Sequence, residues 1–317
     1  MIGINRKVVE VAISDSLADL NTRSLEILNK LKEFKRNNGI LKSRDTEYIN
    51  KIIAEFETTN FITMSLSDLE RIKSEIGEIP VCRRRFNGKK KATLLKDEIL
   101  QILDYKKKRS KLYPEYFQKI GIKACVYCNS QLTITVEKDD GTAKEYSAKF
   151  QLDHYYPKDK YPHLSVCLFN LYPVCSSCNL VKRNNPIDFK LYQNNVSGSI
   201  FKFELNKRSK ATFLSTRNHK DLEISFRNTS DPHYVDVFRV NDIYKTQYDI
   251  AEEIILKSLA YNSSYRKSLI RDFGKHRINN NLINRFILGN YVKESEIHKR
   301  PLAKFMQDIG KESGLIE

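Results

Sequence analysis

Two Cys-x-x-Cys pairs constrain this chain more than any other feature of its sequence: Cys125 with Cys128, and Cys175 with Cys178. A structural zinc takes four tetrahedral ligands, and each Cys-x-x-Cys turn delivers two thiolates to one point. The 46 residues between the pairs, 129–174, are too many for a zinc finger but suit a site that joins two loops. The sequence therefore predicts a zinc held by four cysteines, with no open position for catalysis. Four unrelated buried thiols are the alternative.

The charge of the chain favours an anionic partner. Its 317 residues include 55 Lys and Arg against 39 Asp and Glu, a net charge of +16. Such a surplus repels itself in a compact state unless an anion offsets it, and nucleic acid is the usual partner. Segment 83–123 holds 14 basic and 4 acidic residues, so it carries 14 − 4 = +10 of that surplus. We expect phosphate contacts from its last basic run, with a solvated basic face as the alternative. That run is Lys106, Lys107, Lys108 and Arg109.

The sequence predicts a cytoplasmic protein without a membrane partner. Glu10, Asp15 and Asp19 interrupt the first apolar stretch, so it does not resemble a signal peptide. No run approaches the ~20 apolar residues that span a bilayer. Thiols stay reduced in the cytoplasm, which favours metal binding over disulfides for the cysteine pairs.

Hydrophobic periodicity predicts an α+β fold in four parts. We expect a helical region over 1–82, the basic segment over 83–123, a core over 124–190, and strands followed by helices over 191–317. In the first part, Ile49, Ile52, Ile53 and Phe56 mark one apolar face of a helix over 45–57. Ser67 and Glu70 have the spacing of a capping box for the next helix.

The core segment combines strand patterns with one short helix. Residues 131–137 and 146–154 are rich in β-branched and aromatic residues and are joined through a turn at 139–141. A helix is expected over 176–184. Beyond the core, 199–206 and 221–228 alternate apolar and polar residues, which is typical of half-buried strands.

The motif "LDHYYPK…NLYPVCSSCN" resembles the HNH endonucleases of the ββα-metal superfamily, in the form with two flanking Cys-x-x-Cys pairs. The resemblance covers about residues 122–190. It rests on Asp153 and His154, then Asn170 after sixteen residues, then Asn179 nine residues later, together with both cysteine pairs. It implies that the central region is a zinc-bound ββα-metal nuclease core.

The resemblance also implies roles for these residues. His154 would be the general base that activates water, and Asp153 and Asn179 would bind one catalytic Mg²⁺ or Mn²⁺. Hard oxygen ligands suit these cations better than zinc. Asn170 would hold the loop after the first strand. Many family members have histidine where this chain has Asn179, which leaves the metal preference open. On the sequence alone, Asn170 could also be an ordinary turn residue and His154 a surface histidine.

Further predictions concern partners. Lys158, Lys182 and Arg183 follow the motif and are candidate phosphate contacts, with solvated side chains as the alternative. Segments 235–255 and 298–310 resemble the tails of larger bacterial HNH proteins of antiphage defence, some of which work beside an ATPase. That resemblance implies a regulatory protein partner.

The sequence thus favours a metal-dependent HNH endonuclease that hydrolyses phosphodiester bonds, with DNA preferred over RNA on family grounds. Two other classes remain open. One is a zinc-stabilised nucleic-acid-binding module that does not cut. The other is an interaction subunit whose nuclease centre is vestigial or gated by a partner.

Overall fold

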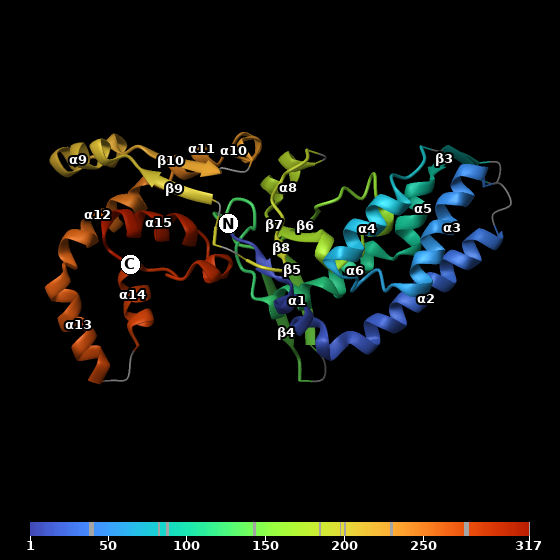
Figure 1. Ribbon diagram of the computed structural model, residues 1–317, viewed down its shortest axis with the longest axis horizontal. Helices are drawn as coiled ribbons and strands as arrows, with labels where there is room; N and C mark the ends of the chain where they lie inside the picture. The colour runs from blue at the N-terminus through green and yellow to red at the C-terminus, as the bar shows by residue number, and fades with distance from the viewer. Residues whose placement is uncertain are drawn as a thin grey trace.

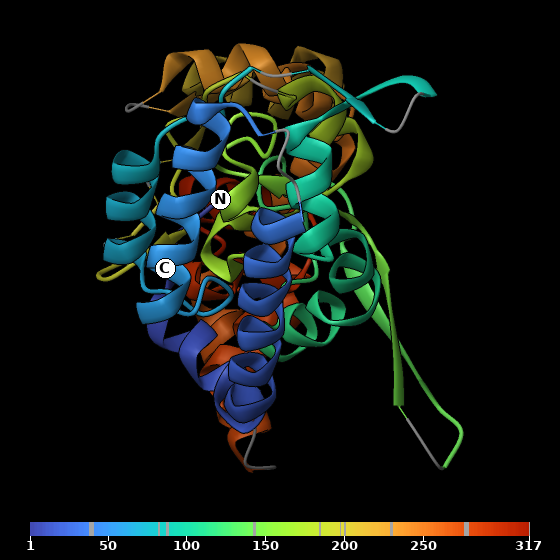
Figure 2. The same cartoon turned by 90° about the vertical axis from the view of Figure 1, so that its right-hand side faces the viewer.

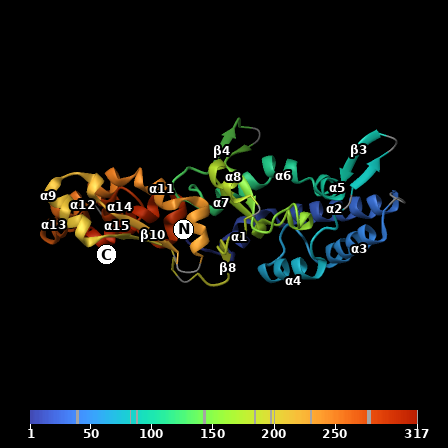
Figure 3. The ribbon, with the colours of Figure 1, turned by 90° about the horizontal axis from the view of Figure 1, so that it is seen from above.

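The computed structural model shows an elongated molecule in which the N-terminal helices and the C-terminal region lie at opposite ends (Figure 1). The view from above shows the same order along the long axis (Figure 3). The structure describes residues 1–37, 41–81, 83–86, 89–141, 144–183, 185–196, 198–199, 201–228, 231–275 and 279–316. Across these residues, no helix is long and apolar enough to cross a membrane. The mixed α+β class is confirmed, with each sheet built from two strands.

Four helices build the N-terminal end. The predicted apolar face of α3 is buried at Ile49, Ile52 and Phe56. The capping box of α4 lies two residues earlier than predicted, because Ser65 and Asp68 form the reciprocal pair. The elements are β1 (Ile4–Asn5), α1 (Arg6–Ile13), η1 (Ser14–Ser16), α2 (Leu17–Asn37), α3 (Ser43–Thr58) and α4 (Leu66–Ile76).

The basic segment continues this helical end. It comprises β2 (Arg83–Phe86), β3 (Lys89–Leu94), α5 (Leu95–Ile102), α6 (Tyr105–Lys111) and α7 (Tyr113–Ile120). Strands β2 and β3 pair antiparallel. Leu95 and Ile99 bury the inner face of α5. The basic side chains of 83–94 lie outside the residues whose side chains are described.

The central region contains two hairpins and one short helix. It comprises β4 (Ile134–Asp139), β5 (Lys144–Lys149), β6 (Gln151–His154), η2 (Pro162–Leu164), η3 (Leu168–Asn170), β7 (Leu171–Val174) and α8 (Ser176–Lys182). The expected single strand over 146–154 is divided at Phe150, because β5 pairs with β4 whereas β6 pairs with β7. The β4–β5 hairpin extends away from the body (Figure 2), and β6–β7 lies beside α8 in the middle of the molecule (Figure 1).

The C-terminal region packs helices around one hairpin. Phe201, Phe203 and Phe226 cover the inner face of β9–β10, as the alternation predicted. The elements are β8 (Tyr192–Gln193), β9 (Phe201–Leu205), α9 (Lys207–Thr216), η4 (His219–Asp221), β10 (Ile224–Asn228), α10 (Pro232–Phe238), α11 (Val240–Lys245), α12 (Tyr248–Ala260), α13 (Ser263–Lys275), α14 (Asn280–Leu288), η5 (Glu294–Lys299) and α15 (Ala303–Ser313).

The buried apolar side chains form one connected cluster from Met1 to Ile316. The cluster therefore passes through the central region rather than stopping at its borders. The predicted boundaries at 82, 123 and 190 stay predictions.

Candidate metal centre and adjoining cleft

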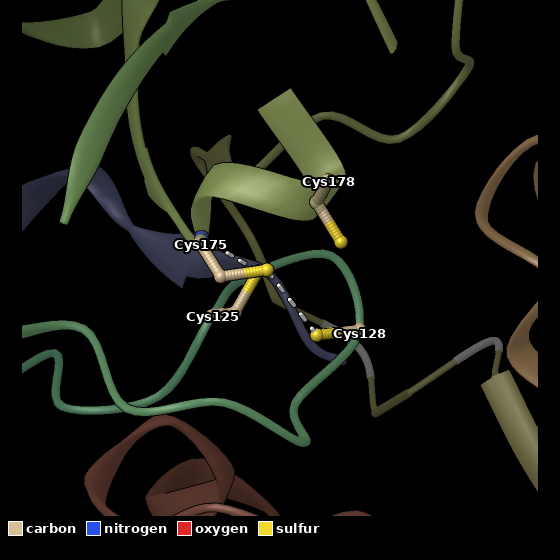
Figure 4. Close-up of side chains that lie close together, drawn as sticks. All are labelled: Cys125, Cys128, Cys175 and Cys178. Carbon is tan, nitrogen blue, oxygen red and sulfur yellow. Dashed lines mark hydrogen bonds between the residues drawn. The ribbon is translucent and has the colours of Figure 1, made fainter. Parts of the chain in front are cut away.

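The four predicted cysteines converge at one point. Cys125 and Cys128 lie on the loop after α7, while Cys175 and Cys178 lie at the start of α8 (Figure 4). All four are buried, and their sulfur atoms lie within 4.8 Å of one another. Tetrahedral zinc with Zn–S bonds of about 2.3 Å places sulfurs about 3.8 Å apart. The predicted cluster is confirmed, and its donor set is compatible with zinc.

Donors around the sulfurs strengthen this fit. The Cys175 amide donates to Cys125 Sγ at 3.3 Å, and the Ser130 hydroxyl donates to Cys128 Sγ at 3.2 Å. Because thiolates are the ligand form, these donors to the sulfurs of Cys125 and Cys128 favour a metal-binding state of the cluster.

The cysteines outside the cluster differ from these four. Cys167 is a buried free thiol with no place in the cluster. Burial raises its pKa to about 12, so it stays a neutral thiol near pH 7. Cys82 lies outside the described residues.

The C-terminal region covers the loop of the first cysteine pair. Tyr244 donates its hydroxyl to the Cys128 carbonyl at 2.8 Å, and Tyr234 donates to the Tyr127 carbonyl at 2.5 Å. Asn129 is fully buried; it donates to the Ile297 carbonyl at 3.0 Å and accepts from the Lys304 amide at 3.1 Å. The cysteine loop is therefore a junction between the core and the last third of the chain. No pattern in the sequence predicted these long-range contacts.

A cleft of about 500 Å³ opens beside the cysteine cluster. Asp153 and His154, at the end of β6, line it together with Asn179 of α8. Arg109 and Lys158 also line this cleft. Three residues of the predicted catalytic set thus share one cavity with basic side chains.

Asp153 is held by two buried partners. Its Oδ2 accepts a hydrogen bond from the Tyr127 hydroxyl at 2.7 Å and forms an ion pair with Lys182 Nζ at 2.8 Å. The side chains of Lys182 and Asp153 are only 2% and 7% exposed. Tyr127 is one of the two residues between Cys125 and Cys128, so the cysteine loop directly orients the Asp153 carboxylate. Its other oxygen, Oδ1, has no protein partner in the described part of the chain.

His154 is buried beneath the cleft. Its Nε2 lies 3.2 Å from the Ser165 carbonyl oxygen, and its ring lies 5.0 Å from that of Tyr105. A carbonyl accepts only, so Nε2 carries the proton and Nδ1 is the basic nitrogen. Burial, aided by the charge of Lys158, lowers the pKa of His154 to about 3. The imidazole is therefore neutral near pH 7.

Asn179 faces away from the sulfurs, although it follows Cys178 directly. Consecutive helical residues point about 100° apart, so Cys178 joins the cluster while Asn179 lines the cleft. Its Nδ2 donates to Gln151 Oε1 at 2.5 Å. This bond leaves Oδ1 as the acceptor without a partner among the described residues.

Asn170 closes the loop between β6 and β7. Its Oδ1 accepts from the Tyr156 amide at 2.7 Å, and its Nδ2 donates to the carbonyls of Tyr156 and Leu164 at 3.2 and 3.0 Å. Asn170 is fully buried and lies on η3, one residue before β7. The side chain therefore ties the two ends of the β6–β7 loop together.

The candidate phosphate-contacting residues divide into two groups. Lys106, Lys107, Arg109 and Arg183 are exposed, and Lys158 is half-buried. Lys182 instead faces inward, where its ammonium also donates to the His154 carbonyl at 3.0 Å. Lys108 is buried too, and its Nζ donates to the Leu103 carbonyl at 2.8 Å. Neither of these two lysines presents its charge at the surface as a phosphate contact requires, because each ammonium is used by an internal acceptor.

His163, on η2 in the β6–β7 loop, is a fully buried histidine. Its Nδ1 lies 2.7 Å from the Tyr48 hydroxyl of α3. Burial lowers its pKa to about 3. The side chain joins the N-terminal helices to the β6–β7 loop and does not line the cleft.

Comparison of the chain with protein-family models, curated proteins and solved structures gave no match. The interpretation of the cleft therefore rests on its own geometry.

A larger cavity of about 840 Å³ lies beside β9–β10. It contains none of the predicted site residues, and its Arg227 is paired with Glu204 at 2.9 Å. Chemistry, rather than cavity size, places the candidate site at the cleft by the cysteine cluster.

Proposed function

We propose that this chain is a metal-dependent endonuclease of the HNH type, which hydrolyses phosphodiester bonds in nucleic acid, with DNA as the favoured substrate. The observation that carries the proposal is the meeting of Asp153, His154 and Asn179 in one cleft. Hydrolysis of a phosphodiester needs a base near the attacking water and positive charge at the scissile phosphate. The β6–β7 hairpin followed by α8 has the order of elements that such a ββα core requires.

The oxygen donors in the cleft fit a hard divalent cation. Asp153 Oδ1 and Asn179 Oδ1 are acceptors without protein partners in the described chain, and both residues line the cleft. Mg²⁺ typically uses one or two such protein ligands and fills its remaining positions with water and substrate phosphate. A bound Mg²⁺ or Mn²⁺ would supply Lewis-acid stabilisation of the phosphate.

Protein side chains would carry out the other steps of hydrolysis. Nδ1 of His154 would accept the proton of the attacking water, since Nε2 is engaged by Ser165. Tyr127 and Gln151 would orient Asp153 and Asn179. Arg109, Lys158 and Arg183 would bind the phosphate backbone at the rim of the cleft. A zinc in the cysteine cluster would keep the start of α8 and the Tyr127 loop in place, with a structural role only.

One observation favours a protein that does not cut on its own. Lys182 neutralises Asp153 at 2.8 Å inside the protein, and a cation beside a carboxylate weakens its affinity for a second cation. A non-cutting module, or a centre that a partner activates, would show this pairing. Antiphage defence and an ATPase partner stay predictions from the resemblance.

Plasmid cleavage separates these functions. The purified protein is incubated with supercoiled DNA in Mg²⁺, Mn²⁺ or EDTA, alone and with proteins co-purified from its host. We expect nicking that requires the divalent cation and is lost in His154→Ala. If neither DNA nor RNA is cut under any of these conditions, the endonuclease proposal is wrong and the binding module remains.

A further inference from the structure

A second cavity of about 430 Å³, which we call the side chamber, lies next to the cleft. The two cavities share Arg109 and Lys158 in their walls. Pockets that hold small ligands begin at roughly 300 Å³. A group attached to a strand in the cleft could therefore enter the chamber past these two basic residues.

The walls of the side chamber combine a mostly buried aromatic ring with solvent-accessible polar groups. Tyr105 lines the chamber with the small accessible part of a ring that is 5% exposed and lies between His154 and Lys158, whose Nζ is 5.4 Å from the ring centre. Leu100 adds apolar surface. The side chains of Gln101 and Asp104 line the chamber without a hydrogen-bond partner in the described part of the chain.

The backbone presents Asp104 in an unusual way. Asp104 connects α5 to α6 with φ 53, in the left-handed region that residues other than glycine rarely adopt. Aspartate adopts this region more readily than most residues other than glycine. This conformation places a carboxylate on the chamber wall at the junction of the two helices.

The charged residues around the side chamber suit a single nucleotide better than a stretch of nucleic-acid backbone. Arg109 and Lys158, at the border with the cleft, suit a phosphate, whereas Asp97 and Asp104 would repel one within the chamber. A nucleobase carries no charge and is read by hydrogen bonds to its edge when it leaves its stack.

We propose that the side chamber binds a base of the nucleic-acid strand held in the cleft, and that Asp104 selects a base with donor groups, guanine first. A carboxylate only accepts hydrogen bonds. Guanine offers it two adjacent donors, N1–H and the N2 amino group, and Gln101 can donate to O6. Thymine and adenine place an acceptor beside their donor. The inference rests on the proposed binding of nucleic acid in the cleft and adds base selectivity to it.

The test measures binding apart from cleavage. The His154→Ala protein is titrated without added divalent cation against fluorescent single strands of thymidine with one central guanine, inosine, adenine or abasic site. A bidentate contact discriminates by roughly five- to a hundredfold, so we expect the guanine strand to bind about tenfold more tightly than thymidine alone. Inosine, which lacks the N2 amino group, should recover only part of this preference.

Two substitutions give the matched comparison. Asp104→Asn keeps the size of the side chain and tolerates the left-handed backbone, and it should reduce the guanine preference below about twofold. Asp236→Asn changes an exposed acid on α10 and should preserve the preference. Zinc content and melting temperature confirm that both variants fold. Equal binding of all strands, or a preference that survives Asp104→Asn, would overturn the inference.

Two further arms separate the possible failures. If guanosine monophosphate binds as tightly as the guanine strand, the chamber is a site for free nucleotides. That result would also overturn the inference that it binds a base of a strand held in the cleft. Cut positions of the native enzyme in Mg²⁺ are mapped in parallel. Cleavage without guanine dependence contradicts the side-chamber inference alone, whereas guanine-dependent binding without any cleavage contradicts the proposed nuclease function alone.

Discussion

The cysteine cluster and the cleft share helix α8, and consecutive residues of that helix serve each of them. Cys178 is one of four buried cysteines whose sulfurs lie close together, whereas Asn179 faces a cavity lined by charged and polar groups. The four sulfur atoms of the cluster lie close enough together to share one metal ion. In the cleft, by contrast, one oxygen atom each of Asp153 and Asn179 has no protein partner in the described chain. The first arrangement is suited to holding structure and the second to receiving a ligand.

The largest expected effect comes from breaking the cluster. Cys178→Ser should release zinc, unfold the start of α8 and abolish cleavage together, because binding free energy in a structural zinc site is folding free energy. Metal analysis and thermal unfolding measure this outcome. Cys167→Ala is the matched control, since it removes a buried thiol outside the cluster and should retain zinc. Well-folded native protein without bound zinc would contradict this role of the cluster.

The next prediction concerns a substitution in the cleft that leaves the cysteine cluster intact. His154→Ala should lower the cleavage rate by about 10²–10⁴-fold, the usual contribution of a general base. Zinc content and DNA binding should stay close to those of the native protein. Both are measured beside the cleavage rate.

His298→Ala controls for the removal of a buried histidine. Like His154, His298 is 5% exposed and contacts a backbone carbonyl through Nε2, at 2.7 Å from Ile2. It lies on η5 of the C-terminal region. If His298→Ala reduces cleavage as much as His154→Ala does, the reduction reflects stability, and His154 has no special role.

The two regions also differ in how far sequence could predict them. The convergence of the cysteines follows from the spacing within each pair, because a short turn fixes the directions of both thiols. The bond from Tyr127 to Asp153 could not be predicted, since it joins positions 26 residues apart through a backbone path that only the fold defines. Lys182 was expected at the surface, where lysines usually lie, and its burial depends on Asp153 as a partner.

The strand break at Phe150 has a related cause. Residues 146–154 form one continuous β pattern, and local propensity does not say with which strand each half pairs. The capping box of α4 was predicted two residues too late, because Ser65 and Ser67 are each followed three residues later by an acidic residue. Local patterns therefore predicted several helices and strands but not the β2–β3 hairpin, while contacts between distant segments decided how the cleft was assembled.

A smaller effect should come from the ion pair that links the two regions. Lys182→Met leaves Asp153 as an unpaired buried charge and should destabilise the protein by about 3–5 kcal/mol. Added Mg²⁺ should then raise its melting temperature more than that of the native protein, since a ligand that binds the folded state stabilises it. Thermal unfolding with and without Mg²⁺ measures both effects.

Lys304→Met provides the matched comparison for that ion pair. Lys304 and Asp308 form a second buried pair, also at 2.8 Å and with side chains 3% and 8% exposed, on α15. Breaking it should cost similar stability but give no response to Mg²⁺. Equal Mg²⁺ responses in the two variants would show that Asp153 is not a cation ligand.

The smallest effect on folding should come from the exposed basic residues of α6, of which Arg109 lines the cleft. Lys106, Lys107 and Arg109 are exposed on α6, whereas Lys108 of the same run is buried against Leu103. Replacing the three exposed residues by glutamine should change stability by less than about 0.5 kcal/mol for each residue. It should weaken DNA binding similarly for all sequences, because phosphate contacts carry no base information.

Salt dependence shows whether these three residues bind phosphate. For each residue that binds a phosphate of duplex DNA, its replacement should flatten the slope of log affinity against log salt by about 0.9. Lys108→Met should instead lower stability with an unchanged slope, because its ammonium is already used by an internal carbonyl. Fluorescence titration of one duplex at several salt concentrations compares the two variants. If the triple variant keeps the native slope, the exposed basic residues of α6 are a solvated face, and Arg109 does not bind phosphate at the cleft.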